Sequence, residues 1–178
     1  ILLSEDLVLD EDIINIINGM RRNSSIRQLT LDCNGSNILD GVIGQAILNV
    51  YQEKDTLTEL RIDRATPPPG ESHISLLPIV EAIRDHRMLE TLDLSRNRIG
   101  NAGCLALAAL LEDPNCNLRS LFLDGNQIDS EGAIAIANGL AKNTMLGELS
   151  LKYNTFDNIL QPDNMRDFQA VEDAFTKL

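Results

Sequence analysis

The sequence predicts an α/β solenoid in which a curved parallel β-sheet lies inside and α-helices lie outside. Short segments of alternating leucines recur at a nearly constant interval, and apolar residues at helical spacing follow each of them. A strand and a helix of this size cannot close a core alone, so neighbouring units must stack. Because the helix layer is thicker than the strand layer, the stack is expected to curve with its sheet on the concave side.

The recurring segment has the form Leu-x-x-Leu-x-Leu and begins at Leu89, Leu118 and Leu146. Looser copies begin at Ile26 and Leu57, so the five starts are separated by 31, 32, 29 and 28 residues. Intervals of this length are typical of repeats that contain a helix. Residues 1–26 superimpose without a gap on residues 121–146, which predicts that the chain begins inside a repeat.

Each unit is expected to contain a short strand, a polar turn and an amphipathic helix. Residues 91–95 alternate between polar and leucine side chains, which predicts a strand with one buried face. Asn97, Asn126 and Asn154 follow the strands at one offset, where their amides are expected to satisfy turning backbone. We expect Asp129 or Ser130 to cap a helix. The residues predicted on the buried helix stripes are Leu105, Leu107, Ala108, Leu111, Ile134, Ala137 and Leu140.

The pattern predicts a repeat array over 1–160, made of a half repeat plus about five repeats, and a C-terminal capping helix over 161–178. An amphipathic docking helix for a partner is the alternative for that last segment. The unit that begins at Leu57 departs from the pattern, with Ala65 in the asparagine position and an insertion at 66–72 that contains three prolines. This stiff loop is either a tolerated insertion or a contact beside the binding surface.

A family pattern runs through one unit as Leu89-x-x-Leu92-x-Leu94-x-x-Asn97-x-Ile99-x-x-x-Gly103-Cys104-x-x-Leu107. It resembles the ribonuclease-inhibitor-like class of leucine-rich repeats, and the resemblance covers about residues 1–155. That class includes inhibitors, innate-immune receptors, GTPase-activating proteins, actin-filament cappers and ciliary scaffolds, so the resemblance implies a fold rather than one partner. Residues 56–63 are also similar to a strand of the tropomodulin actin-capping domain.

The 15 Lys and Arg residues against 27 Asp and Glu residues give a formal charge of -12. This charge disfavours nucleic acid and anionic membranes and favours a protein partner with a basic surface. The alternative is that the acids are spread over solvated helix faces and serve solubility. Cys33, Cys104 and Cys116 are an odd, widely spaced set, which predicts free thiols and a cytoplasmic location.

The residue types needed for catalysis do not fall at useful spacings. His73 and His86 have no second metal ligand at a zinc-site spacing, and Cys104 has no histidine at a matching place. The sequence contains no glycine-rich phosphate loop. We therefore expect no catalytic site, cofactor, metal or small-molecule substrate.

Strand alternation predicts which side chains point away from the core on the concave face. Phe122 is the expected anchor, because it lies between two inward leucines. The predicted partner-binding residues are Phe122, Asp124, Asp93, Asp63, Asp32, Arg61, Lys152 and Tyr153. Asp32 and Asp63 are expected on adjacent strands, where a partner's Lys or Arg would relieve their repulsion. Alternatively, neighbouring Arg61 or Arg96 compensates these charges.

These features predict a non-catalytic protein-protein interaction module that binds its partner through the concave face. Two alternatives stay open at this point. A GTPase-regulating domain would supply Arg96 or Arg98 to a partner's active site. An architectural subunit of a cytoskeletal or ciliary assembly would have its convex helices covered as well.

Overall fold

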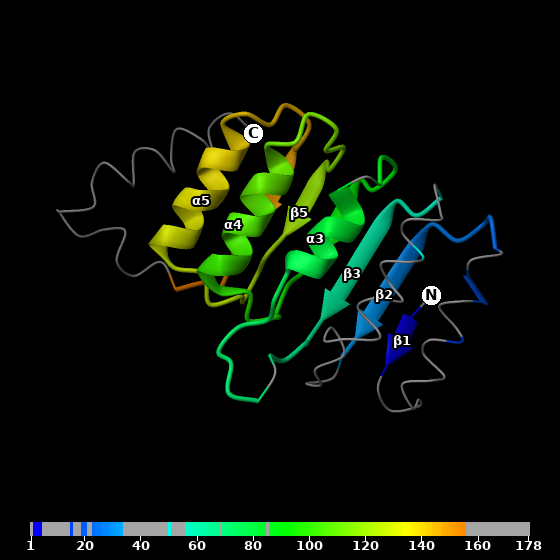
Figure 1. Ribbon diagram of the computed structural model, residues 1–178, viewed down its shortest axis with the longest axis horizontal. Coiled ribbons are helices and arrows are strands. Elements are labelled where there is room, and N and C mark those ends of the chain that lie inside the picture. Colours follow the sequence, from blue (N-terminus) through cyan, green and yellow to red (C-terminus); the bar gives the residue numbers. More distant parts are fainter. Residues whose placement is uncertain are drawn as a thin grey trace.

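The structure is a computed structural model that describes residues 2–4, 15, 19–20, 23–33, 50, 56–67, 69–84 and 86–155. Figure 1 shows strands lying side by side with helices covering one face of the sheet. Of the helices expected before residue 57, only the helical residues 15, 19–20 and 50 are described, and the C-terminal capping helix predicted at 161–178 lies outside the described residues.

Six parallel strands form one sheet in the order of the chain, from β1 to β6. Their bounds are β1 Leu2–Ser4, β2 Gln28–Asp32, β3 Glu59–Asp63, β4 Thr91–Asp93, β5 Ser120–Phe122 and β6 Glu148–Ser150. The register aligns one row of leucines across the last five strands, namely Leu29, Leu60, Leu92, Leu121 and Leu149. The predicted parallel stacking is therefore confirmed.

The described helices are α3 Leu77–Arg84, α4 Gly100–Leu111 and α5 Ser130–Leu140, and they cover the side of the sheet to which the leucines point. Helix α5 is capped as expected, because the Asp129 carboxylate accepts a hydrogen bond from the Glu131 N–H at 2.8 Å. We call this side the helical face. The opposite side of the sheet, where Arg61, Asp63 and Phe122 lie, is called the open face.

The helices pack on the sheet mainly through residues at helical spacing, and two predicted core positions need correction. Leu107 and Ala137 are buried, as expected, and Ile136, which was not among the predicted positions, is fully buried as well. The prediction for Leu105 is wrong, since its side chain is 62% exposed. Leu105 lies about 100° around the helix from the buried Cys104, which turns it away from the sheet. Ile134, at the matching place in α5, is only half-buried.

The repeated asparagines form a ladder along the turns that follow the strands. Each side-chain oxygen accepts a hydrogen bond from the backbone N–H at the same position of the preceding unit. The pairs are Asn97 with Ala65, Asn126 with Asn97 and Asn154 with Asn126, all at 2.8 Å. Their NH₂ groups donate to backbone carbonyls at the strand ends of the preceding units, which are those of Ile62, Leu94 and Leu123. These asparagines are therefore structural, as the sequence indicated, and Ala65 cannot extend the ladder.

Candidate functional site

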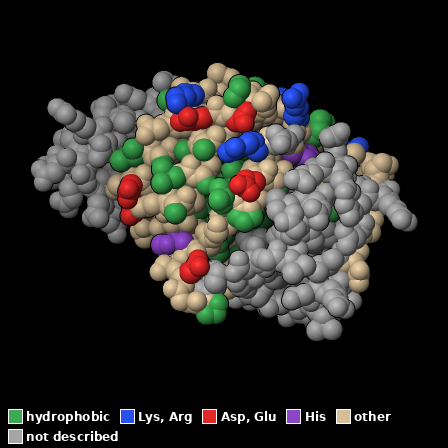
Figure 2. Space-filling model, in the orientation of Figure 1, with side chains coloured by type: hydrophobic (Ala, Val, Ile, Leu, Met, Phe, Trp, Pro, Cys, Tyr) green, Lys and Arg blue, Asp and Glu red, His purple; other side chains and the backbone are tan. Residues whose placement is uncertain are grey.

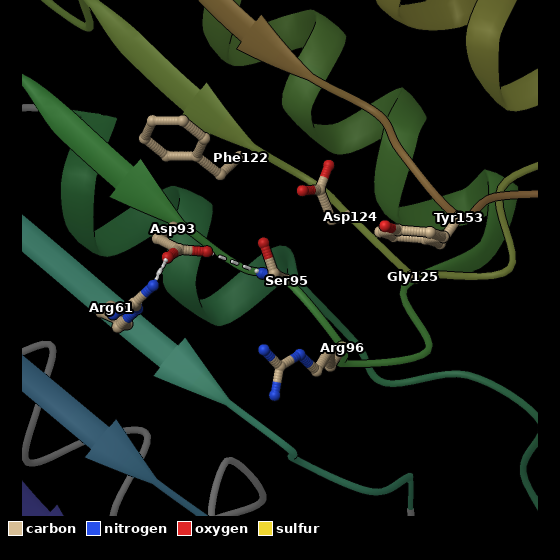
Figure 3. A pocket seen from close by; sticks show the side chains of 8 residues that line it. All are labelled: Arg61, Asp93, Ser95, Arg96, Phe122, Asp124, Gly125 and Tyr153. Carbon is tan, nitrogen blue, oxygen red and sulfur yellow. Dashed lines mark hydrogen bonds and ion pairs between the residues drawn. The ribbon is translucent and has the colours of Figure 1, made fainter.

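An open hollow of about 420 Å³ lies on the open face, over the ends of β3, β4 and β5. Strand residues and the turns after β4, β5 and β6 line it, as Figure 3 shows. The lining residues are Arg61, Asp93, Ser95, Arg96, Phe122, Asp124, Gly125 and Tyr153. Five of the eight predicted partner-binding residues therefore meet in one place, whereas Asp32, Asp63 and Lys152 do not line the hollow.

Phe122 forms the apolar wall of the hollow. Its neighbours Leu121 and Leu123 are fully buried, so strand alternation places the Phe122 ring on the open face, where it is partly exposed. The parallel register aligns Phe122 with Asp93 on one side and with Ser150 on the other. The ring thus lies among polar neighbours and offers apolar surface to a ligand.

Three turn residues at one repeat position, each seven residues after the start of its unit, line the hollow. They are Arg96, Gly125 and Tyr153, with φ angles of 62°, 65° and 59°. This left-handed conformation turns the chain out of each strand. Because Gly125 has no side chain, space stays open between the other two, and the Tyr153 side chain is 88% exposed.

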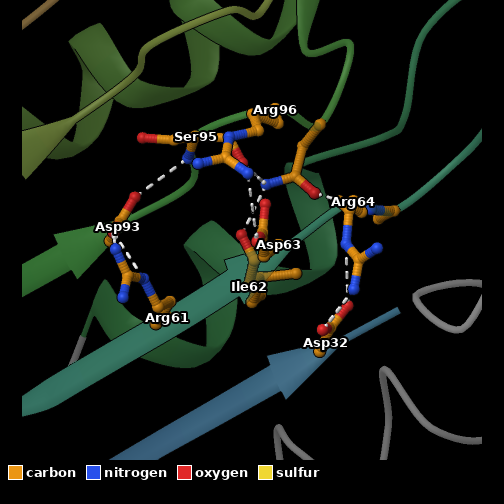
Figure 4. Close-up of polar contacts among 10 residues, drawn as sticks. Asp32, Arg61, Ile62, Asp63, Arg64, Asp93, Ser95 and Arg96 are labelled. Carbon is orange, nitrogen blue, oxygen red and sulfur yellow. Dashed lines mark hydrogen bonds and ion pairs between the residues drawn. The ribbon is translucent and has the colours of Figure 1, made fainter. Parts of the chain in front are cut away.

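Arginine–aspartate pairs neutralise much of the charge at the N-terminal side of the hollow (Figure 4). The Arg61 Nε donates to the Asp93 carboxylate at 2.7 Å, and the Ser95 N–H donates to the same carboxylate at 3.0 Å. Asp93 is only 7% exposed, although strand alternation placed it among the outward residues of the open face. Both carboxylate oxygens of Asp93 therefore have hydrogen-bond partners within the chain, Oδ2 from Arg61 and Oδ1 from Ser95.

The predicted repulsion between Asp32 and Asp63 is relieved within the chain. These residues are aligned on adjacent strands, as expected. Arg64 makes hydrogen bonds to the Asp32 carboxylate. The Arg96 guanidinium lies 3.9 Å from the Asp63 carboxylate, which is too long for a hydrogen bond, and Asp63 Oδ1 has no hydrogen-bond partner among the described residues. This arrangement favours the alternative in which arginines compensate these charges, and it adds Arg64 to the two arginines named above.

Asp124 is placed differently from these three aspartates. One of its oxygens accepts hydrogen bonds from the Ser150 hydroxyl at 2.6 Å and from the Lys152 N–H at 2.8 Å. Within the described residues no Lys or Arg side chain forms an ion pair with it. The carboxylate is therefore held in position between Phe122 and Tyr153 while it keeps its charge facing the hollow (Figure 3).

Strand alternation gave no reason to select Gly125 or to assign Arg96 to the same surface as Phe122. Both occupy the turn position that Tyr153 also occupies. The signal that identifies them is the constant offset of seven residues from Leu89, Leu118 and Leu146, rather than the alternation of the strands.

The cysteines and the metal-ligating residue types are the described residues that bear on nucleophilic and metal chemistry. Cys33, Cys104 and Cys116 are buried free thiols, and burial raises the pKa of Cys104 to about 12. Among the described side chains, no three His, Cys, Asp or Glu residues converge as metal ligands. None of the described helices is both long enough and apolar enough to span a membrane.

Comparison with known proteins gives the same picture of the repeats. The leucine-rich-repeat family model matches residues 85–108 and 115–137. Mouse (Mus musculus) ribonuclease inhibitor is 38% identical over 76 residues, which cover 43% of this chain and 17% of that protein. The Rho GTPase-activating protein gacW of Dictyostelium discoideum is 26% identical over 167 residues, which cover 91% of this chain and 15% of that protein.

Among solved structures, Leiomodin-1 Actin-Binding Site 2 superimposes with a TM-score of 0.51 at 15% identity, covering 96% of this chain and 75% of that one. At this level of identity the likeness shows the fold alone. The chain is a leucine-rich-repeat protein. Its units resemble those of the ribonuclease-inhibitor-like class, and the units that begin at Leu89 and Leu118 follow the strand, asparagine turn and helix of that pattern.

Proposed function

We propose that the chain is a non-catalytic interaction module that holds a protein partner on its open face, with Phe122 as the central anchor. One observation carries this proposal, which is that an aromatic ring, an exposed tyrosine and a fixed carboxylate line a single hollow. The residues that contribute most to binding at protein interfaces are enriched in Trp, Tyr and Arg, and they cluster in pockets near the centre of the interface. The partner offers a basic side chain to Asp124 and an apolar group to Phe122.

Two relatives support a protein partner as the ligand class. Ribonuclease inhibitor is named for a protein target, and the superimposed leiomodin chain is named as an actin-binding site. Repeat proteins of this kind present extended curved surfaces rather than closed pockets. The hollow described here is open and suits a protruding side chain of a larger ligand.

Affinity capture tests the proposal. The immobilised wild-type chain is compared with Phe122→Ala and with Met88→Ala, because Met88 is 46% exposed and lies outside the lining of the hollow. We expect a partner that is retained by the wild type and by Met88→Ala but is lost at least tenfold with Phe122→Ala. Equal retention by all three proteins would show that the partner does not bind at the hollow.

A GTPase-regulating role is the second candidate, and one observation favours it. The Arg96 side chain is 70% exposed at the edge of the hollow, and the similarity to a Rho GTPase-activating protein runs along most of the chain. An arginine supplied to a GTPase accelerates hydrolysis by about 10³-fold or more. Arg96→Lys would abolish such stimulation in a Rho GTPase assay, whereas a pure binding module gives no stimulation to lose.

A further inference from the structure

The outer surface of helix α4 carries no charged residue. Helices on a protein surface normally show polar side chains to solvent. The α4 sequence GNAGCLALAALL contains no acidic or basic residue over its twelve positions, and Ala102, Leu105 and Ala109 are exposed. Its neighbours differ, because α3 exposes Glu81 and Arg84 and α5 exposes Glu131.

Leu105 is the middle member of an apolar row that crosses three helices. Leu77, Leu105 and Ile134 each follow a buried residue at the same place in the repeat, namely Leu76 just before α3, Cys104 in α4 and Ala133 in α5. Leu77 and Leu105 are 56% and 62% exposed, and Ile134 is half-buried. The repeat thus places three aliphatic side chains in register on the helical face. Figure 2, which looks onto this face, shows apolar side chains gathered over α3, α4 and α5.

The spacing of this row matches the geometry of an α-helix laid across it. Helices α4 and α5 pack closely side by side, since a Cβ on Gly139 of α5 would lie 2.9 Å from the Cα of Ala108 in α4, and α3 lies beside α4 (Figure 1). Neighbouring helices at such contacts are about 8–10 Å apart. Seven residues of an α-helix rise about 10.5 Å. A crossing helix with an apolar side chain at every seventh position would therefore meet all three members of the row.

Acidic side chains surround the row. Glu81 lies one turn after Leu77, Glu131 lies one turn before Ile134, and Glu112 follows the end of α4. Within the described residues, Glu81 and Glu131 form no ion pair, whereas Lys142 pairs with Glu112 at 2.9 Å. Exposed Arg84 is the only basic residue on α3, α4 and α5. Glu81 and Glu131 are therefore the carboxylates beside the row that are complementary to basic side chains of a ligand.

We propose that the row of Leu77, Leu105 and Ile134 is a second docking surface, and that it binds an amphipathic helix of another protein. The bound helix has apolar residues at seven-residue intervals and Lys or Arg on its flanks. This surface lies on the helical face, opposite the hollow at Phe122, so the proposal is independent of the function proposed above. With both faces engaged, the chain bridges two ligands.

A designed peptide tests this surface directly. The probe is a fluorescein-labelled helix of about 20 residues, with leucine at every seventh position, lysine on the flanks and alanine elsewhere. Two control peptides carry the same residues with the leucines moved off one face, or glutamate in place of lysine. We expect fluorescence anisotropy to show the probe binding the chain at least tenfold more tightly than either control. Equal binding of the probe and the rearranged peptide would overturn the proposal.

Variants of the chain then locate the site. Leu105→Ser is expected to weaken probe binding at least tenfold, and Leu77→Ser provides a second test from the neighbouring helix. Met88→Ser is the matched control, since it removes an equally exposed apolar side chain outside the row. Phe122→Ser removes the open-face anchor and is expected to leave probe binding unchanged. Binding that survives both leucine changes, or that is lost with Phe122→Ser, would overturn the assignment, and thermal unfolding of each variant confirms that it is folded.

Discussion

The two ends of the open face use the same repeat positions for different purposes. Around β2, β3 and β4, aspartates and arginines from adjacent units pair with one another, as Arg61 does with Asp93. Around β5 and β6 the equivalent positions hold Phe122 and Asp124, and within the described residues no arginine reaches that carboxylate. One end of the face is therefore neutralised within the chain, and the other keeps aromatic surface and charge for a ligand.

The same two ends differ in how their turns are tied together. From Asn97 to Asn154 each turn is bonded to the preceding one through a buried side-chain amide, while Ala65 leaves the next step without one. The aromatic end of the open face thus stands on the more regular part of the described array. Hydrogen-bonded turns and the binding groups Phe122 and Asp124 therefore occur together at this end of the face. Binding groups held in place by such turns lose less conformational entropy when a ligand binds.

The largest expected effect comes from breaking the ladder at its centre. Asn126→Ala leaves the Asn97 N–H and the Leu94 carbonyl unsatisfied in the core, so we expect it to lower the free energy of unfolding by about 3 kcal/mol. Urea unfolding measures this change. Asn115→Ala, in an exposed turn, is the control and should cost less than about 1 kcal/mol. Similar losses for both variants would show that the ladder adds no special stability.

Filling the gap at the aromatic end should have the next largest effect. Gly125→Arg adds a side chain to the hollow at a turn position where Arg64, Arg96 and Tyr153 already adopt positive φ angles. We therefore expect a modest stability cost of about 1 kcal/mol but a loss of partner affinity of about 30-fold, or about 2 kcal/mol. Calorimetric titration measures the affinity. An unchanged affinity would mean that the ligand does not enter the hollow.

Removing one negative charge at each end compares the two ends directly. Asp124→Asn keeps an oxygen that accepts the Lys152 N–H, yet it should weaken partner binding about tenfold, because its charge faces the hollow. Asp63→Asn makes the same change in net charge where Arg96 already lies close, and it should weaken binding less than twofold. Surface plasmon resonance on both variants measures the contrast. Equal losses would indicate that only net charge matters.

The smallest expected effect is on stability at the neutralised end. Asp93→Asn removes the ion pair with Arg61 but keeps an oxygen that accepts the hydrogen bond from the Ser95 N–H. Because the Arg61 side chain is 53% exposed, we expect a loss of only about 1 kcal/mol in the free energy of unfolding. Asp124→Asn should cost less than this, since it breaks no ion pair among the described residues. Thermal unfolding that ranks the two in the opposite order would contradict the contrast between the ends.

Much of the fold could be predicted from the sequence because the spacing of apolar residues follows which side chains are buried. The recurring leucines gave the strand faces and register, and the asparagine offset gave the turns that the ladder joins. The burial of Leu105 was predicted wrongly because nearly all residues of α4 are apolar. Such a helix can be rotated about its axis and still present an apolar stripe to the sheet. The direction that α4 faces is set by its contacts with α3 and α5, which one helix sequence does not contain.

The candidate site could be predicted only in part, because alternation describes strands and the hollow also uses turns. Phe122, Asp124 and Tyr153 were selected from the sequence, and the structure brings them together. The arginine pairing that removes Asp93 and Asp63 from the charged surface depends on side-chain reach across units. Like charges in register therefore looked repulsive in the sequence although arginines from adjacent units compensate them.

The most direct test of the account is hydrogen exchange on the chain with and without its captured partner. We expect slower amide exchange in peptides that cover residues 120–126 and 148–154, with little change in residues 28–33. Protection confined to residues 28–33 and 59–64, with the Phe122 and Tyr153 segments unaffected, would contradict the account.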